Sequence, residues 1–446
     1  MNLLRKIFPP LCLMISFMLL IYTFFRSEIY WDGYNPSTNS KNYYIVYYIA
    51  STLLIIFSII TFFLNKKIKD YLIITLISCI TGIYISEGYL TFKRYDLTFQ
   101  KQLYEKETGK KYDTRTPIEI YEDLKKIDNN ITVQHGYTRR MFNNYNVPQK
   151  ITFFSGISNS KTIMCNENGY YSIIQSDRYG FNNPDYEWDN KEVEYLLIGD
   201  SFVSGNCVNR PNDIASVLRT LSNKSAISLG YGGNGPLIEF ATLREYLNSN
   251  VKKVIWFYYE NDLLELSKEL DDKILTSYLN DLTYSQNLKS KQNEIDLLAE
   301  TKIEKNRAKK IKENSFVFKV FEFIKIYNLR SFLTIKEQVN AKIPVDQKEF
   351  KKILELAKDL TTKNNSKLYF VYLPPYALYK TEYDNSKHFL VKKIINELNI
   401  PFIDIHTELF KKEKNPLKFF SFELNNHFNI EGYKKVSEII YKLTKD

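Results

Sequence analysis

Two side chains suited to acyl transfer stand far apart in the second half of the chain. Ser201 lies in the run GDSFVSG, residues 199–205, directly after an apolar run and before a helical pattern. A serine on such a turn is exposed and lies near the positive end of the following helix. His427, one of four histidines, precedes the last predicted helix. Brought together, a serine and a histidine act as nucleophile and general base on an ester.

Two further segments offer hydrogen-bond donors to a developing negative charge. The run SLGYGGNGP, residues 228–236, contains four glycines, which allow the backbone to expose N–H groups. The run YYENDL, residues 258–263, places Asn261 and Asp262 at the end of another predicted strand. An amide such as that of Asn261 is able to stabilise an oxyanion. A tight turn or a capped helix explains each segment alone, but their order at successive strand ends favours one site.

Alternating strands and helices are expected to position these residues. Short β-branched and aromatic runs predict strands at 194–199, 225–229, 253–259, 367–373 and 401–405. Apolar residues at helical spacing predict helices at about 212–222, 236–248, 346–363, 384–398 and 431–443. This alternation is typical of an α/β fold with a parallel sheet. Functional residues of such a sheet gather beyond the carboxyl ends of its strands, where the candidate residues fall.

The arrangement resembles the SGNH, or GDSL, hydrolase family over about residues 190–446, where four motif blocks match in order. The resemblance implies a flavodoxin-like three-layer α/β/α sandwich. It implies a serine nucleophile, an imidazole base and two oxyanion donors, here Ser201, His427, Gly233 and Asn261. More narrowly, GDSFVSGNCV, GYGGNGP and GFNNP are similar to segments of membrane-attached bacterial members. Supporting roles are expected for Asp200, Asp262 and Asn425.

The chain departs from the family pattern at the third member of the triad. The family carries an aspartate two or three residues before the histidine, where this chain has Leu424 and Asn425. We therefore expect a Ser/His dyad oriented by a backbone carbonyl, with Glu423 or Asp404 as alternative acids. The glycine and third-strand motifs also depart from the pattern, at Ser228, Tyr259 and Glu260.

Three apolar blocks before residue 93 predict membrane-spanning helices. Residues 7–25 and 43–64 carry no charge, and residues 71–90 carry none before Glu87. Each is long enough to cross a hydrocarbon core of about 30 Å. A cleaved signal peptide followed by buried core helices is the alternative. The lysines and arginine that flank the blocks place the N-terminus in the cytoplasm, so that residues from about 93 onward lie outside it.

Composition restricts the remaining possibilities. The net charge of +10 comes from scattered lysines and is accompanied by no nucleic-acid-binding signature. No CxxC or His/Cys metal spacing occurs, so we expect neither a metal nor a cofactor. Cys165 and Cys207 are the two cysteines outside the apolar blocks, and an oxidising compartment would permit a disulfide between them. Two unpaired buried thiols are the alternative.

The expected organisation has three parts. Residues 1–92 form a membrane anchor, residues 93–190 a small subdomain, and residues 191–446 the hydrolase-like domain. The subdomain includes polar segments such as NENGYY, residues 166–171. Residues 262–342 contain no glycine or proline and are interpreted as a helical insertion that serves as a lid or a partner surface.

The predicted function is a membrane-anchored serine esterase or deacylase that acts outside the cytoplasm on acyl, foremost acetyl, esters of an envelope glycan or lipid. An alternative is an O-acyltransferase that modifies a polysaccharide together with a multi-span membrane partner. A second alternative is a non-catalytic module that binds glycan, since the expected aspartate is absent. The bilayer and the acylated substrate are the expected partners, and no nucleic acid is expected.

Overall fold

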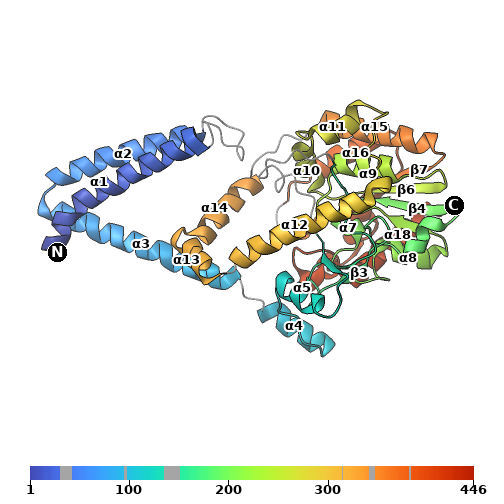
Figure 1. Ribbon diagram of the computed structural model, residues 1–446, viewed down its shortest axis with the longest axis horizontal. Helices are drawn as coiled ribbons and strands as arrows, with labels where there is room; N and C mark the ends of the chain where they lie inside the picture. The colour runs from blue at the N-terminus through green and yellow to red at the C-terminus, as the bar shows by residue number, and fades with distance from the viewer. Residues whose placement is uncertain are drawn as a thin grey trace. The chain divides into compact units, whose positions relative to one another are not determined.

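The chain forms two compact units. The computed structural model describes residues 1–30, 43–94, 98–134, 151–313, 315–340, 347–380 and 383–445. One unit, called here the helical unit, consists of Met1–Asp96 and Phe316–Asn340. The other, the sandwich unit, consists of Leu97–Ser315 and Ala341–Asp446. Figure 1 shows the elements of both along the chain.

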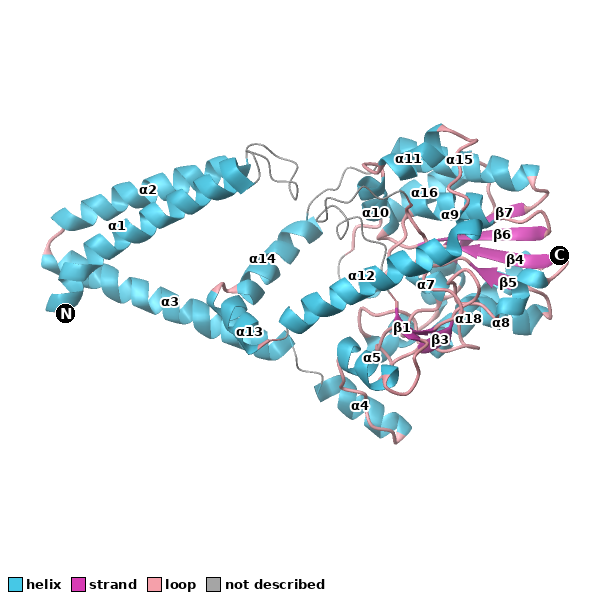
Figure 2. Cartoon of the chain, viewed as in Figure 1, coloured by secondary structure: helices cyan, strands magenta, loops and turns pink. Residues whose placement is uncertain are grey.

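A five-stranded parallel sheet forms the centre of the sandwich unit (Figure 2). Its strand order is β5-β4-β6-β7-β8, and every neighbouring pair is parallel. The strands are β4 (Val193–Ile198), β5 (Ala226–Ser228), β6 (Val251–Tyr258), β7 (Lys367–Tyr372) and β8 (Phe402–Asp404). All five lie where the apolar runs predict them. The predicted parallel α/β fold class is therefore confirmed.

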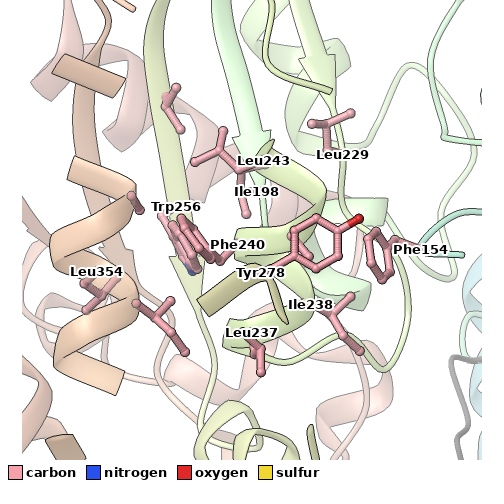
Figure 3. Close-up of a cluster of buried hydrophobic side chains, with 14 of the residues drawn as sticks. Phe154, Ile198, Leu229, Leu237, Ile238, Phe240, Leu243, Trp256, Tyr278 and Leu354 are labelled. Atoms are coloured by element: carbon pink, nitrogen blue, oxygen red, sulfur yellow. The ribbon is translucent and has the colours of Figure 1, made fainter. Parts of the chain in front are cut away.

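Helices cover both faces of this sheet because successive strand side chains point to opposite sides. On β6, Val254, Trp256 and Tyr258 enter one apolar cluster, while Ile255 and Phe257 enter the other. The first cluster contains residues of α9 (Pro236–Tyr246), α15 (Gln347–Lys363) and α16 (Ser386–Glu397). Figure 3 shows part of it around Trp256, Phe240 and Leu354. The second cluster contains residues of α8 (Ile214–Ser222) and α18 (Ile430–Thr444).

A small second sheet precedes the sandwich and was not predicted from the sequence. Its strands are β1 (Ile131–Val133), β2 (Lys161–Ile163) and β3 (Ile173–Gln175), with β2 parallel to β1 and antiparallel to β3. Two helices accompany it, α4 (Thr98–Thr108) and α5 (Pro117–Lys125). The side chains of Thr116 and Glu119 form a capping box at the start of α5. These strands have three residues each, too few for periodicity to reveal them.

Three long apolar helices form most of the helical unit. They are α1 (Asn2–Phe24), α2 (Tyr43–Phe63) and α3 (Lys66–Arg94). Each is long and apolar enough to cross a membrane, as the sequence predicted. The guanidinium of Arg5 on α1 pairs with the carboxylate of Asp70 on α3, and the hydroxyl groups of Ser16 and Ser58 join α1 to α2. Polar contacts of this kind hold helices together in an apolar surrounding.

The region expected to form one helical insertion is divided between the two units. Helices α10 (Asp262–Glu269), α11 (Lys273–Asn280) and α12 (Gln292–Glu313) belong to the sandwich unit, where Leu266 and Leu275 enter its core. Helices α13 (Phe316–Ile324) and α14 (Tyr327–Asn340) belong to the helical unit. None of the residues of α13 is buried. The insertion therefore has two parts with different surroundings.

Candidate active site

The first and last motifs of the sandwich unit meet at one point. Strand β4 runs through Gly199 and Asp200 into α7 (Ser201–Ser204), so Ser201 lies just beyond the carboxyl end of a central strand. His427 lies on the loop before α18. The Nε2 atom of His427 lies 2.8 Å from the Oγ atom of Ser201. This is the geometry in which an imidazole removes the proton from a serine hydroxyl.

The other ring nitrogen of His427 faces a carboxylate that the sequence analysis did not identify. The Oε2 atom of Glu167 lies 2.9 Å from the Nδ1 atom of His427 and also accepts the backbone N–H of His427 at 2.6 Å. The side chains of His427 and Glu167 are 20% and 26% exposed, so both are partly accessible to solvent. Ser201, His427 and Glu167 thus form a continuous hydrogen-bonded triad, in place of the expected dyad oriented by a carbonyl.

The acids considered from the sequence lie elsewhere. Asp404 pairs with Nε2 of His388 at 3.0 Å and accepts the hydroxyl of Thr407, so it belongs to a separate cluster. Glu423 accepts the side-chain amide of Asn415 at 2.7 Å. Asn425, expected as a supporting residue, is exposed. None of these three residues occupies the position at Nδ1 of His427, because Glu167 fills it.

A disulfide fixes the loop that carries Glu167. The Sγ atoms of Cys165 and Cys207 are bonded, and Cys207 follows Ser201 closely along the chain. The Sγ atom of Cys207 lies 3.9 Å from Nδ1 of His427, directly beside the triad. The amide of Asn168 adds a second connection, since it donates to the carbonyl of Cys207 at 2.8 Å. The acid is therefore held by a covalent link and hydrogen bonds rather than by a strand of the main sheet.

The pKa values of His427 and Glu167 are shifted in directions that agree with the geometry of the triad. Burial lowers the pKa of His427, but the hydrogen bond and charge of Glu167, with the charge of Asp200, raise it above its ordinary value overall. Burial raises the pKa of Glu167, and the interactions with His427 reverse that effect, so the net shift is downward. Both shifts favour an imidazolium paired with a carboxylate. A group arranged in this way stabilises the charge that His427 acquires when it takes a proton.

The expected oxyanion donors lie on loops beyond β5 and β6. Gly233 has a φ of +84°, a conformation that glycine adopts without steric cost. Among the residues that the structure describes, its N–H donates to no other group. Asn261 occupies the N-cap position of α10, although its side chain makes no capping hydrogen bond. Burial raises the pKa of Asp200, and a hydrogen bond with the side chain of Asn261 opposes this rise. Asp262 is buried and accepts the N–H of Tyr259 at 2.9 Å, so its role is to shape this loop.

The segment GFNNP ties the nucleophile's helix to the glycine loop. The side chain of Asn182 donates to the carbonyl of Ser204 at 2.9 Å. The side chain of Asn183 exchanges two hydrogen bonds with the backbone of Ser228, at 2.8 and 2.9 Å. A Cβ on Gly230 would lie 2.4 Å from the backbone N of Ser204, so only glycine permits this approach. The distance between Ser201 and the glycine loop is thereby fixed.

One group of potential metal ligands coincides with the triad. Ligand atoms of Glu167, Cys207 and His427 lie within 4.8 Å of one another. The sulfur of Cys207 is bonded to Cys165 and offers no thiolate, while the carboxylate and the imidazole engage each other. Thiolate sulfur is the form of cysteine that binds metals. These residues therefore fit a proton-transfer site better than a metal site.

Comparisons with known proteins give structural neighbours at low similarity. No protein-family model and no curated protein matches the chain. A lipolytic protein of the G-D-S-L family from Desulfitobacterium hafniense aligns with 16% identity and a TM-score of 0.32, over 57% of this chain and 99% of its own. The acetyl xylan esterase AlAXEase aligns with 13% identity and a TM-score of 0.33, over 57% and 100%. A G-D-S-L family protein from Veillonella parvula aligns with 12% identity and a TM-score of 0.34, over 56% and 98%. The roles of residues in this chain rest on its own geometry.

Proposed function

We propose that the chain is a serine-dependent ester hydrolase whose triad is Ser201, His427 and Glu167. The observation that carries the proposal is the unbroken series of contacts from Oγ of Ser201 through both ring nitrogens of His427 to the carboxylate of Glu167. A serine, an imidazole and a carboxylate in this order recur on unrelated folds that carry out acyl transfer. The partial exposure of His427 and Glu167 leaves the triad open to a large acylated substrate.

In the proposed reaction, Oγ of Ser201 attacks the ester carbonyl while Nε2 of His427 takes its proton. Glu167 holds Nδ1 of the ring and stabilises the imidazolium. The backbone N–H groups of Ser201 and Gly233 and the amide of Asn261 stabilise the oxyanion. Collapse of the intermediate breaks the ester bond, and the alcohol leaves with the proton of His427. Water, deprotonated by the same imidazole, then releases the acid from Ser201.

The substrate and location form a further part of the proposal. Three helices that are long and apolar enough to span a membrane support an anchored enzyme, and the positive residues that flank them in the sequence support a location of the sandwich unit outside the cytoplasm. A disulfide beside the triad agrees with an oxidising compartment. The substrates that an anchored enzyme meets there are acyl esters of envelope glycans and lipids, and acetyl esters are the first to assay. A multi-span membrane partner would be needed only if the acyl group is transferred rather than hydrolysed.

Covalent labelling of the full-length protein with a fluorophosphonate probe tests the proposal. We expect labelling of the wild type, its loss in Ser201→Ala and its decrease in His427→Ala. Ser222→Ala is the matched control, because the hydroxyl of Ser222 donates to the carbonyl of Leu218 and accepts the N–H of Lys224, both local contacts at the end of α8. Folded wild type without labelling, or labelling that persists in Ser201→Ala, would contradict the proposal.

A second assay separates hydrolysis from the two alternatives. Release of free acetate from acetylated oligosaccharide supports the esterase, whereas transfer of acetyl to added oligosaccharide supports the acyltransferase. Binding of glycan without either product supports the non-catalytic module. The main argument for that module was the absent aspartate, and the carboxylate of Glu167 at Nδ1 of His427 removes this argument.

A further inference from the structure

The hairpin formed by α13 and α14 packs on one stripe of α3. Tyr84, Glu87, Gly88 and Thr91 of α3 follow helical spacing and all meet the hairpin. The hydroxyl of Tyr84 donates to the carbonyl of Ile324 at 2.9 Å, and its ring lies 5.4 Å from that of Phe323. Residues three and four apart share one face of a helix. The hairpin therefore covers a defined side of an apolar helix.

Glu87 makes this attachment specific. Its side chain is fully buried, although α3 is otherwise uncharged between Asp70 and Lys93. Its carboxylate accepts the backbone N–H groups of Asn328 and Leu329 at 3.0 and 2.8 Å, and the side-chain amide of Asn328 at 2.9 Å. The first N–H groups of a helix lack partners within the helix, and a carboxylate satisfies both their hydrogen bonds and their partial charge. In the part of the chain that the structure describes, the hydrogen-bond partners of the Glu87 carboxylate thus belong to the hairpin.

The rest of the hairpin exposes apolar side chains on a scale unusual for a water-soluble surface. The exposed large residues of the hairpin are Phe316, Val317, Val320, Phe321, Phe323, Ile324, Tyr327, Phe332 and Leu333. Phe316 is 81% exposed and Val317 63% exposed. Helix α3, on which the hairpin packs, also exposes apolar side chains, and Ile77 and Ile85 are 53% and 67% exposed. Both surfaces need the same apolar surrounding.

Charged residues are interspersed along the hairpin and are mainly basic. Lys319, Lys325 and Arg330 are exposed, and Glu322 is partly exposed. The sequence of α14 adds Lys336 and Glu337. Long basic side chains keep their charge at the lipid headgroups while their stems lie along apolar surface. An amphipathic helix with apolar aromatic residues and flanking lysines is typical of a segment that lies in the membrane interface rather than across it.

We propose that α13 and α14 form a membrane-interface hairpin, in which an insertion of the catalytic chain returns to the bilayer and lies among the lipid headgroups beside α3. The occupant of its exposed face is lipid. Glu87 fixes the position of the hairpin along α3, seven residues before the end of that helix at Arg94. The chain therefore enters the helical unit twice, first through α1, α2 and α3 and again through α13 and α14, between α12 and α15.

Site-directed fluorescence in proteoliposomes of the full chain tests this proposal. Cys12 and Cys79 are replaced by serine, the disulfide is left oxidised, and an environment-sensitive fluorophore is attached to Phe321→Cys. We expect the emission at position 321 to be blue-shifted. Lipids that carry a quencher near the headgroup should reduce this emission more than lipids that carry a quencher deep in the acyl chain. Ile77→Cys, in the middle of α3, should show the opposite order, and Lys393→Cys, 75% exposed on α16, should be quenched by neither lipid.

Two results would overturn the proposal. Emission at position 321 that matches the aqueous control at position 393 would place the hairpin in water. Blue-shifted emission that neither lipid quenches would mean that protein, such as a second copy of the chain, covers the face instead. Circular dichroism of each labelled protein reports whether its helices are folded, and this control does not depend on the proposed hydrolysis.

Discussion

The triad draws on two regions of the sandwich unit that are built in different ways. The parallel sheet supplies Ser201 at a strand end and His427 before the last helix, and both positions follow from the fold. The small subdomain supplies Glu167 from a loop between two short strands, and a disulfide and side-chain hydrogen bonds hold that loop. The carboxylate that we propose as the acid thus comes from outside the sheet that positions Ser201 and His427, and a disulfide fixes its loop.

Loss of the nucleophile should have the largest effect. Ser201→Ala removes the atom that forms the acyl-enzyme, so we expect kcat for ester hydrolysis to fall by about 10⁴-fold or more. Steady-state assays with an acetyl ester measure this. An activity close to that of the wild type would mean that hydrolysis does not depend on Ser201.

Removal of the subdomain's carboxylate should have the next largest effect. Glu167→Gln keeps the shape of the side chain but removes the charge that stabilises the imidazolium, and we expect kcat to fall by about 10²- to 10⁴-fold. Glu423→Gln is the matched control, because Glu423 lies near His427 in sequence and bonds Asn415 instead. Equal losses in the two variants would contradict the assignment of the acid.

Loss of the disulfide between Cys165 and Cys207 should have a smaller effect on kcat. A double Cys165→Ser, Cys207→Ser variant keeps all three triad groups but frees the loop of Glu167, and displacement of about 1 Å costs up to about 100-fold in rate. The same change in a Glu167→Gln background should cause little further loss of activity, because the carboxylate that the disulfide positions is then absent. Fully additive losses would show that the disulfide acts on activity through stability alone.

The free energy of unfolding should also depend on the disulfide between Cys165 and Cys207. The disulfide closes a loop with a sequence separation of 42 residues. In the chain-entropy model, such a link contributes about 2–4 kcal/mol to the free energy of unfolding. Thermal denaturation of the oxidised protein and of the double serine variant compares the two, and an unchanged melting temperature would contradict the expectation.

The sequence predicted the parallel sheet well, for physical reasons. The strands are buried on both faces and read as apolar runs, and motifs at their ends mark Ser201, Gly233, Asn261 and His427. The three apolar helices are equally evident from their length. The oxyanion roles of Gly233 and Asn261 stay predictions.

The acid could not be predicted because nothing local marks it. Glu167 lies in an irregular loop, and its distance from His427 along the chain carries no periodic signal. The sequence predicted Glu423 or Asp404 as the alternative acids, because the aspartate expected before His427 is replaced by Leu424 and Asn425. The one signal available was the spacing of two residues between Cys165 and Glu167, together with the position of Cys207 soon after Ser201. A disulfide between those cysteines brings the loop of Glu167 close to the segment that follows Ser201.

The pH dependence of kcat/KM tests the central claim most directly. The pKa of His427 lies above its ordinary value of about 6.5 because Glu167 stabilises the imidazolium. Activity requires the neutral imidazole, so the acid limb of the wild-type profile should have its midpoint above that pH. In Glu167→Gln the pKa of His427 falls, and the limb should move to lower pH while the plateau decreases. The assignment of Glu167 would be contradicted if the acid limb of the pH profile stayed in place in Glu167→Gln and moved instead in Glu423→Gln or Asp404→Asn.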